Sequence, residues 1–391
     1  MQSDMHYYGT YAMARAAGLK PEACKIIATS AQYVDDNAGK NTIAFEDGAA
    51  IYLDATAHHA TDAKNLDVED QRDVWVPFHF FPGNQGDTYT ERLVCQIDSP
   101  LAREMVEHNL SLADKPFSLE LIGITAHVYA DTFSHYGFSG VSSRHNMVSF
   151  SSIKLEGLTE ESEAYFKKKA QSFMQKYGIE GKDMPNIKVP NFKKLWAKKK
   201  EQYSSFIAER ASGGLGHGAV LTYPDMPYLK WSFQYQGVKK WTFENALTTP
   251  EKQKSARVEH NNPKTFIKGC EALHSMFQRY GKAAPQHVEN HGRAFAEIKD
   301  SVDEIFNFQG GKKDRADKWQ QAAKAGLLFT NDEGIPQYDE NDWHTERDKL
   351  AELESSNEAI EKPIYRFFQA AAHHRTYVLR DLLPAHGLIV N

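Results

Sequence analysis

The sequence contains little cysteine: Cys24, Cys95 and Cys270 are the only three in 391 residues. Their number is odd and they lie far apart, which excludes both a disulfide framework and a zinc site built from thiolates. Any metal ion must therefore be held by histidine, aspartate or glutamate side chains.

The N-terminus lacks a basic region followed by an apolar segment, and no apolar run reaches the length of a membrane span. We therefore expect a protein that is cytoplasmic when made, although export by a specialised secretion system, as an effector, would need neither feature. The net charge of -6 disfavours a protein that coats nucleic acid with positive charge, so no stable nucleic-acid partner is expected.

Signals for helices outnumber those for strands. Gly18 suits the end of one helix and Pro21 suits the first turn of the next, while residues 39 to 56 read as loop and short strand. Further helices are expected over residues 99–138, 159–179, 190–211, 242–328 and 339–382. The sequence thus predicts a mainly α fold with long ordered loops. We divide it into a metal-binding domain, residues 1–240, and an appended C-terminal helical part, residues 241–391, that packs on the first as one unit or contacts a membrane.

The stretch "GITAHVYADTFSHYGFSG" places His127, Asp131 and His135 at two successive steps of four residues. On an α-helix such residues share one face, so two imidazoles flank a carboxylate. Zinc accepts both ligand types, and a carboxylate with two oxygens can bridge two ions. A lone triple of this kind is more often two ordinary histidines beside a surface charge, so a metal site needs further ligands.

Further candidate ligands occur in short clusters within the first 225 residues. His79 stands in the apolar stretch "VPFHFFPG", where a charged imidazolium would be costly and a neutral ring is expected. Each cluster alone is more often structural than functional, but their concentration favours a shared site. The other clusters are "SDMHYYG" with His6, "QYVDDNA" with Asp35 and Asp36, "TAHHATD" with His58 and His59, and "GLGHGAVLTYPD" with His217 and Asp225.

Taken together, "DMHYYGTYA", "YVDD", "TAHH", "FHFFPG", the H-x-x-x-D-x-x-x-H helix and "GHGAV-x-x-YPD" resemble the bacterial zinc metallophospholipase C family, in particular its secreted effectors. The wider superfamily also includes zinc-dependent single-strand nucleases. The similarity covers roughly residues 4–231. It implies a phospholipase C-like helical domain that hydrolyses glycerophospholipids, at a phospholipid or membrane surface, to diacylglycerol and a phosphorylated headgroup.

The resemblance also implies two or three zinc ions, or other divalent metals, and a ligand set. Asp131 would bridge two ions, with His127 on the first and His6 on the other. Either Asp35 or Asp36, and either His59 or His79, would complete the coordination of the first ion. Asp35 or Asp36 would also act catalytically, by orienting the attacking water or accepting its proton. The implied metal ligands are His6, Asp35, Asp36, His59, His79, His127, Asp131, His135 and His217.

Three features depart from the family pattern. His135 and His217 would hold a third ion, for which the family adds a glutamate four residues after its last histidine. Leu221 occupies that position here, so Asp225 is the substitute we expect. The family helix also places its final histidine further from the aspartate than His135 stands from Asp131. The family's N-terminal amine ligand has no clear counterpart, because six residues precede Tyr7.

Other functions remain open. The same scaffold supports a nuclease or a phosphatase, for which the basic run Lys193–Lys200 would track a nucleic-acid backbone. A non-catalytic interaction protein stabilised by a metal is a further alternative. An HD-type phosphohydrolase needs an adjacent His-Asp pair, which is absent, and a ferritin-like di-iron protein needs paired E-x-x-H motifs, of which only Glu271–His274 occurs. The segment Ile364–Leu383 could contact a membrane, but a packed terminal helix is the favoured interpretation.

Overall fold

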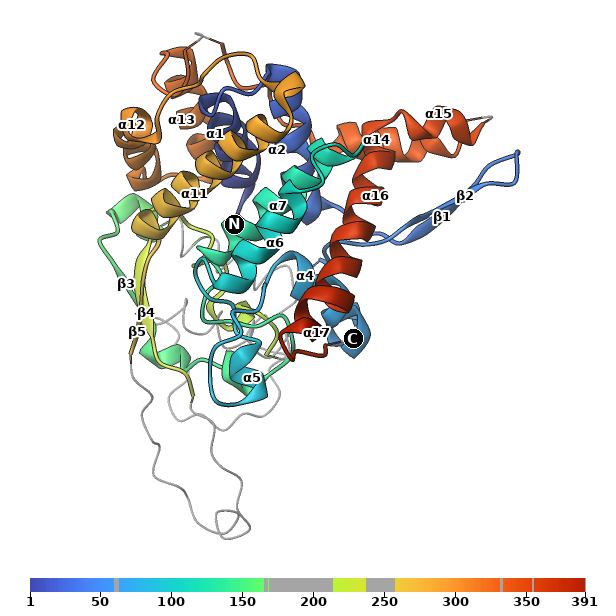
Figure 1. The fold of residues 1–391 in the computed structure, drawn as a ribbon. Coiled ribbons are helices and arrows are strands. Elements are labelled where there is room, and N and C mark those ends of the chain that lie inside the picture. The colour runs from blue at the N-terminus through green and yellow to red at the C-terminus, as the bar shows by residue number, and fades with distance from the viewer. Residues whose placement is uncertain are drawn as a thin grey trace, which may run out of the picture.

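The computed structural model describes residues 1–59, 63–164, 168, 214–236, 257–330, 333–353 and 355–390. Over these residues the chain is mainly helical, with two small antiparallel sheets (Figure 1). The expected mainly α class is therefore confirmed. The helix expected over 190–211, most of the one expected over 159–179, the run Lys193–Lys200 and the boundary near residue 240 lie outside the described residues.

The elements have the following bounds. The helices before residue 140 are α1 (Thr10–Ala16), α2 (Pro21–Asp36), α3 (Val68–Asp70), α4 (Val76–Phe78), α5 (Tyr89–Arg92), α6 (Pro100–Leu110) and α7 (Ser118–Thr132). Those after residue 260 are α11 (Asn262–Ala283), α12 (Phe295–Asn307), α13 (Lys312–Lys324), α14 (Glu340–Leu350), α15 (Ser356–Ile360), α16 (Pro363–Thr376) and α17 (Leu383–Ala385). The strands are β1 (Asn41–Ala44), β2 (Ala50–Leu53), β3 (Lys154–Glu156), β4 (Lys230–Phe233) and β5 (Val258–Asn261), and π-helical segments span Asp4–Gly9, Gln71–Trp75 and Tyr377–Leu382.

Local sequence signals set the ends of the main helices. Gly18 has a φ of +99°, a conformation that favours glycine, and separates α1 from α2. Pro21 occupies the first turn of α2, as expected. Helix α6 begins with Pro100, and the Ser99 side chain accepts a hydrogen bond from the Ala102 backbone N–H. The two helices expected around Gly18 are therefore present.

Helix α7 runs through the centre of the molecule and is buried along almost its whole length. Helices α2, α6, α11 and α16 all pack on it (Figure 1). Gly123 allows α2 to come close, because a Cβ atom at this position would collide with the backbone of Ile27 and the side chain of Ser30. This position makes α7 the support from which side chains can point into the interior.

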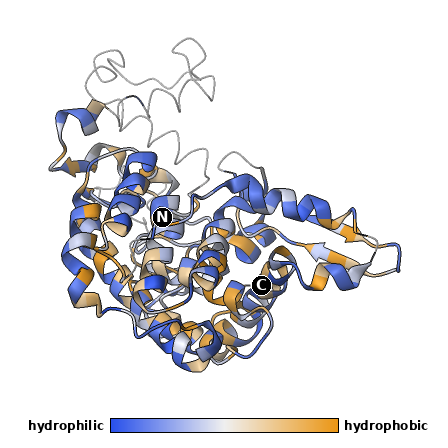
Figure 2. Cartoon of the chain, turned by 90° about the horizontal axis from the view of Figure 1, so that it is seen from above, coloured by the Kyte–Doolittle hydropathy of each residue, from blue (hydrophilic) through white to orange (hydrophobic). Residues whose placement is uncertain are grey.

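Both ends of the sequence contribute to one continuous hydrophobic core, which includes Met1 and Val390. The apolar residues of α16, including Ile364 and Phe367, are buried in this core. A smaller cluster surrounds Trp231 of β4 in the sheet β3-β4-β5. Figure 2 shows many hydrophilic residues on the outer helices. None of the helices in the described ranges has both the length and the apolar character that crossing a membrane requires.

The two small sheets lie away from α7. In the hairpin β1-β2, Asn41 pairs with Leu53 and Ala44 with Ala50, and the hairpin projects from the helical body (Figures 1 and 2). Strand β4 lies between β3 and β5 in the other sheet. The candidate site is therefore built on the helices and on the turns that connect them.

The first residues of the chain are held by a helix from the C-terminal half. The Arg315 side chain of α13 is completely buried, and its Nε donates to Asp4 Oδ2 at 2.7 Å. Its Nη2 donates to Gln2 Oε1 at 2.7 Å and to Asp4 Oδ1 at 3.1 Å. These bonds fix the segment that leads from Met1 into the π-helical turn Asp4–Gly9.

Candidate metal centre

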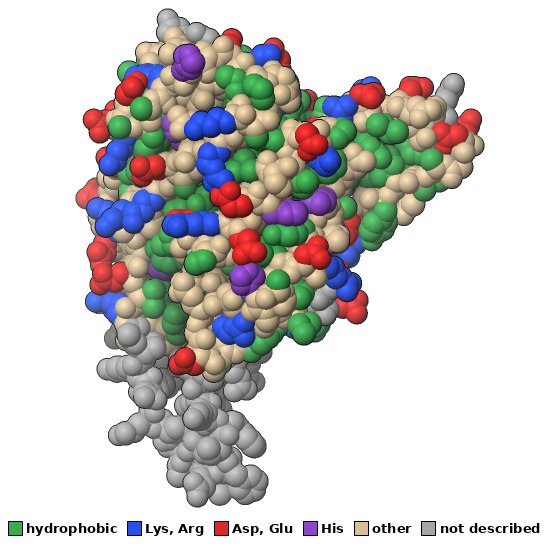
Figure 3. Space-filling model, in the orientation of Figure 1, with side chains coloured by type: hydrophobic (Ala, Val, Ile, Leu, Met, Phe, Trp, Pro, Cys, Tyr) green, Lys and Arg blue, Asp and Glu red, His purple; other side chains and the backbone are tan. Residues whose placement is uncertain are grey.

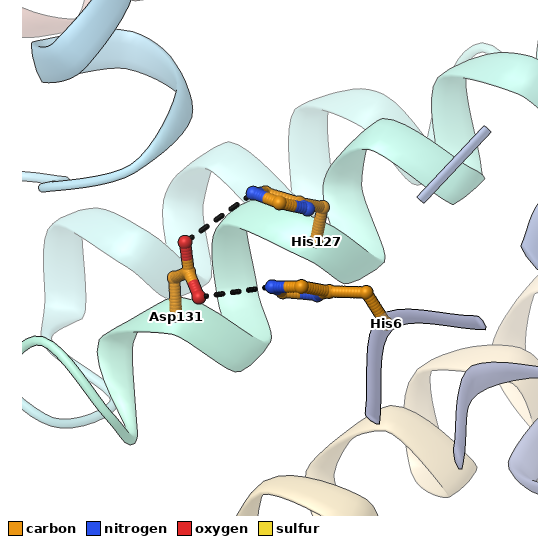
Figure 4. Close-up of side chains that lie close together, drawn as sticks. All are labelled: His6, His127 and Asp131. Atoms are coloured by element: carbon orange, nitrogen blue, oxygen red, sulfur yellow. Dashed lines mark ion pairs between the residues drawn. The ribbon is translucent and has the colours of Figure 1, made fainter. Parts of the chain in front are cut away.

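Asp131 lies in the last turn of α7 and is fully buried. Its Oδ1 atom accepts a hydrogen bond of 2.7 Å from the amino group of Met1 and lies 3.2 Å from His6 Nε2. Its Oδ2 atom lies 3.3 Å from Nε2 of His127, one turn earlier on the same helix. Figure 4 shows the rings of His6 and His127 stacked, with a nitrogen of each directed at a different carboxylate oxygen. Asp131 thus stands where a carboxylate could serve two ions.

A second group brings Asp35, His79 and His127 together. The Nδ1 atom of His79 lies 3.3 Å from His127 Nε2 and 3.7 Å from Asp35 Oδ1. The other nitrogen of each ring is bonded to a backbone carbonyl: His127 Nδ1 to Ala31 at 2.7 Å, and His79 Nε2 to Thr56 at 2.8 Å. A carbonyl can only accept, so these nitrogens carry protons, and in the neutral form of each ring the lone pair of the other nitrogen points into the cluster.

A third group consists of His135, His217 and Asp225. Asp225 Oδ1 lies 3.0 Å from His135 Nε2 and 3.8 Å from His217 Nε2. The Nδ1 atom of His217 donates to the Leu221 carbonyl at 2.6 Å, which turns its Nε2 toward the group. The structure therefore brings Asp225 to the position expected of the substitute for the missing glutamate at Leu221.

His135 does not lie on α7, contrary to the expectation that all three residues of the motif share one helix face. The helix ends at Thr132, and His135 follows in the bend after it. Its ring nevertheless returns to the cluster, with Nδ1 3.3 Å from Asp131 Oδ2. The same nitrogen lies 2.9 Å from the His79 carbonyl. The bend therefore brings His135 back to Asp131 although the helix has already ended.

The amino group of Met1 is a member of the cluster that the sequence did not reveal. It lies 3.3 Å from His135 Nε2 and 3.4 Å from Asp225 Oδ1, in addition to its bond with Asp131. Burial opposes its charge, but the carboxylates of Asp131, Asp225 and Asp35 outweigh this effect and raise the pKa of the amine to about 11. No local sequence motif predicts where the Met1 amine lies. Its position depends on Arg315, which binds Gln2 from more than three hundred residues away in sequence.

Burial shifts the pKa values of the histidines and carboxyl groups in the cluster. It is the main cause that lowers the pKa of His6 to about 3 and that of His217 to about 4. Burial also lowers the pKa of His79, as its apolar setting predicts. For Asp131, burial acts the other way, but the surrounding histidines and the amine hold the pKa of this carboxyl well below its usual range. For His127, burial also opposes the charge, but the carboxylates of Asp131 and Asp35 outweigh it and raise the pKa of this ring. The cluster thus sets the neutral rings of His6, His79 and His217 beside an ionised carboxylate, which are states that bind metal ions.

Several buried atoms of the cluster are unsatisfied. Both ring nitrogens of His6 and the Oδ2 atom of Asp131 make no hydrogen bond among the described residues. An unpaired buried polar atom is costly, and divalent cations bound to the Asp131 carboxylate would satisfy its Oδ2 atom and one ring nitrogen of His6. The donor set is made of nitrogen and oxygen without thiolates, which suits zinc and similar borderline ions. The residues present therefore fit a metal centre.

Two of the expected ligands lie outside these groups. Asp36 faces away from the cluster: its carboxylate accepts hydrogen bonds from the Tyr338 hydroxyl and, at 3.1 Å, from Gln32 Nε2. Burial raises the pKa of Asp36 to about 6. His59 is exposed. Of the alternatives left open by the sequence, the structure brings Asp35 and His79 to the cluster.

Asp35 is the most exposed member of the cluster. The side chain of Asp35 is 31% exposed, whereas that of Asp131 is 1% exposed. Trp75 is partly exposed and lies beside His79, with ring centroids 4.9 Å apart. A carboxylate and an apolar ring are therefore the parts of this region that solvent reaches.

The comparisons with known proteins yield one match. A family model described as a family of unknown function (DUF6765) matches residues 1–382. No curated protein and no solved structure matches the chain significantly. The likeness to zinc metallophospholipases C therefore rests on the residues of this chain alone.

Proposed function

Because the chain belongs to a family of unknown function (DUF6765), we propose its function from the geometry of the site: it is a metal-dependent phosphodiesterase, and within that class a phospholipase C. The observation that carries the proposal is the convergence of His/Asp groups on one buried carboxylate, Asp131. Such density of nitrogen and carboxylate ligands around one residue is more than a single structural ion needs.

In this proposal one set of residues holds each ion. Asp35, His79 and His127 hold the first, with Asp131 Oδ2 beside them. His6, Asp131 Oδ1 and the amine of Met1 flank the second. The third lies among His135, His217 and Asp225. When bound, zinc ions supply charge that stabilises a phosphoryl group and promotes ionisation of water near neutral pH.

Asp35 is the residue of this chain best placed to handle the proton of the attacking water. It combines a partly exposed carboxylate with a position at the edge of the cluster, so it can accept a proton and pass it to solvent. In phospholipase C hydrolysis the water oxygen bonds to phosphorus and the phosphorus–oxygen bond to diacylglycerol breaks. The departing glycerol oxygen then takes up a proton, which balances the reaction.

A lipid substrate is favoured by the apolar surface beside the ligands. The partly exposed ring of Trp75 lies beside His79, with centroids 4.9 Å apart. The net charge of -6 also makes the chain a poor match for a polyanion such as DNA. These features support a substrate with both a phosphate and an apolar part.

The test is a substrate panel. Purified protein is incubated with vesicles of phosphatidylcholine or phosphatidylglycerol and, separately, with single-stranded DNA, and the bound metals are measured. We expect two or three zinc ions per chain and release of diacylglycerol, which a chelator abolishes and zinc restores. DNA cleavage without diacylglycerol would assign the scaffold to a nuclease instead. At most one bound ion without hydrolysis of either substrate would indicate a metal-stabilised interaction protein.

A further inference from the structure

A second pair of metal-binding side chains lies on the surface, away from the buried cluster. His108 stands in the last turn of α6 and His373 in the last turn of α16. Their Nε2 atoms are 3.3 Å apart, although the residues are 265 positions apart in sequence. Both side chains are partly exposed. Figure 3 shows histidine side chains meeting on the face that carries α6 and α16.

The separation of the two nitrogens fits a shared ion. Two nitrogens bound at about 2.0–2.1 Å to a tetrahedral zinc ion lie roughly 3.3 Å apart. The same distance, 3.3 Å, separates His79 Nδ1 from His127 Nε2 in the buried cluster. The two rings are close enough for a direct hydrogen bond, and the same spacing fits two ligands of one ion.

Neighbouring rings hold the pair in this arrangement. The His108 ring lies flat on Tyr377, with centroids 3.4 Å apart and planes 5° from parallel. The His373 ring is nearly parallel to that of His108, with planes 7° apart, and lies beside Phe117, with centroids 5.9 Å apart. Rings fixed in this way lose little freedom when they bind an ion.

The surrounding charges leave the pair ready to bind a cation. Partial burial lowers the pKa of both imidazoles, and for His108 the neighbouring His373 adds to this effect, so both rings are neutral at pH 7. The negative charge of Asp381 acts in the opposite direction and raises the pKa of both rings, but does not outweigh burial. One turn before His108, Glu104 is bonded to His386 at 2.8 Å. The face thus offers two neutral nitrogens beside negative charge.

We propose that His108 and His373 form a surface site for zinc or another borderline transition-metal ion, bound through the two Nε2 atoms with water completing the coordination. The ion links α6 to α16. The next residue of α16, His374, bonds the Pro77 carbonyl at 2.9 Å, two residues before His79. Metal binding at the surface therefore strengthens the attachment of the helix that supports one wall of the buried cluster. This proposal does not depend on the chain being a phospholipase.

Equilibrium dialysis against zinc, with untagged protein, tests the site. We expect His108→Ala and His373→Ala each to bind one ion fewer than the unchanged chain, or to bind it at least about tenfold more weakly. Asp131→Asn is expected to lose ions of the buried cluster but to keep this one. Far-UV circular dichroism checks that the variants are folded.

His386→Ala is the matched control, because His386 lies on the same face but outside the pair. It should keep the full number of ions. Retention of the untagged protein on immobilised Ni²⁺ gives a second measurement, since only accessible histidines can reach the resin. We expect His108→Ala and His373→Ala to elute at several-fold lower imidazole than His386→Ala. Equal zinc binding and equal elution for all three variants would overturn the proposal.

Discussion

The two ends of α7 each carry a buried carboxyl group, and the two groups differ in their partners and in their pKa. Asp131, in the last turn, has the Met1 amine and three imidazoles, those of His6, His127 and His135, within 3.3 Å of its oxygens. Glu120, in the first turn, is 1% exposed, and its Oε2 atom makes no hydrogen bond among the described residues. Asp131 is held ionised, whereas burial raises the pKa of Glu120 to about 7.

Burial alone therefore does not determine whether a carboxyl group of this helix is ionised. Burial disfavours the charge of both residues, and only the partners decide which one keeps it. The partners of Asp131 come from the N-terminus, from α7 itself and from the bend after it. For Glu120, burial raises the pKa, and a hydrogen bond from its own backbone N–H and the charge of Arg366 offset this only in part. One helix therefore presents a candidate cation site at one end and, at the other, a carboxyl group whose pKa is raised to about 7.

The largest effect should come from Asp131→Asn, which removes the charge but keeps the shape. We expect it to lose bound metal and to lower phosphodiesterase activity at least about a hundredfold, because two of the proposed ions lose a shared ligand. Metal content by mass spectrometry and diacylglycerol release measure the two effects. Retained metal and retained activity together would refute the site.

Glu120→Gln is the matched control at the other end of the same helix. It also converts a buried carboxyl group to an amide, so it reproduces the general disturbance of such a change. We expect unchanged metal content and a rate within about twofold of the original, since surroundings without ligands leave Glu120 no part in the cluster. Equal losses in both variants would mean that the effect of Asp131→Asn is structural.

The next largest effect should show whether His79 or His59 is the metal ligand. The sequence alone left both possible. His79→Ala removes a proposed ligand beside Asp131 and should lower metal affinity and activity by about ten- to a hundredfold. His59→Ala changes an exposed side chain and should alter neither. Metal titration of the two variants is the measurement. If the His59 variant is the impaired one, the ligand assignment at this end of α7 is wrong.

Local pattern was enough to find α7 and the residues on it. The four-residue spacing of His127 and Asp131 and the small residue Gly123 are properties of one helix, so they could be predicted from sequence. The same holds for the break at Gly18, where the chain needs a positive φ. The predicted mainly helical class followed from such local signals.

What could not be predicted depends on contacts between distant segments. Asp35 and Asp36 are neighbours in sequence, and only the helix rotation that turns Asp36 toward Tyr338 decides which faces the cluster. The Met1 amine reaches Asp131 because Arg315 holds Gln2 and Asp4. His135 leaves the helix face because α7 ends three residues earlier, at Thr132. No pattern within one segment contains this information.

The smallest effect should appear at the Glu120 end, as a dependence of stability on pH. The pKa of Glu120 rises from 4.5 in the ordinary state to about 7 in the fold, so between these values the folded chain binds a proton that the unfolded chain lacks. Stability therefore decreases as pH rises through this window. Relative to Glu120→Gln, the unchanged protein should lose roughly 1–3 kcal/mol of unfolding free energy between pH 4.5 and pH 8.

Urea unfolding of the two proteins across this pH range measures the difference, in which contributions from groups common to both cancel. The contrast with Asp131 makes the sign informative. A carboxylate whose folded pKa lies below its ordinary value contributes stability that is lost as pH falls, which is the opposite trend. If the unchanged protein instead gains stability over Glu120→Gln as pH rises, Glu120 is ionised in the fold. It would then have a cationic partner, and the two ends of α7 would be alike.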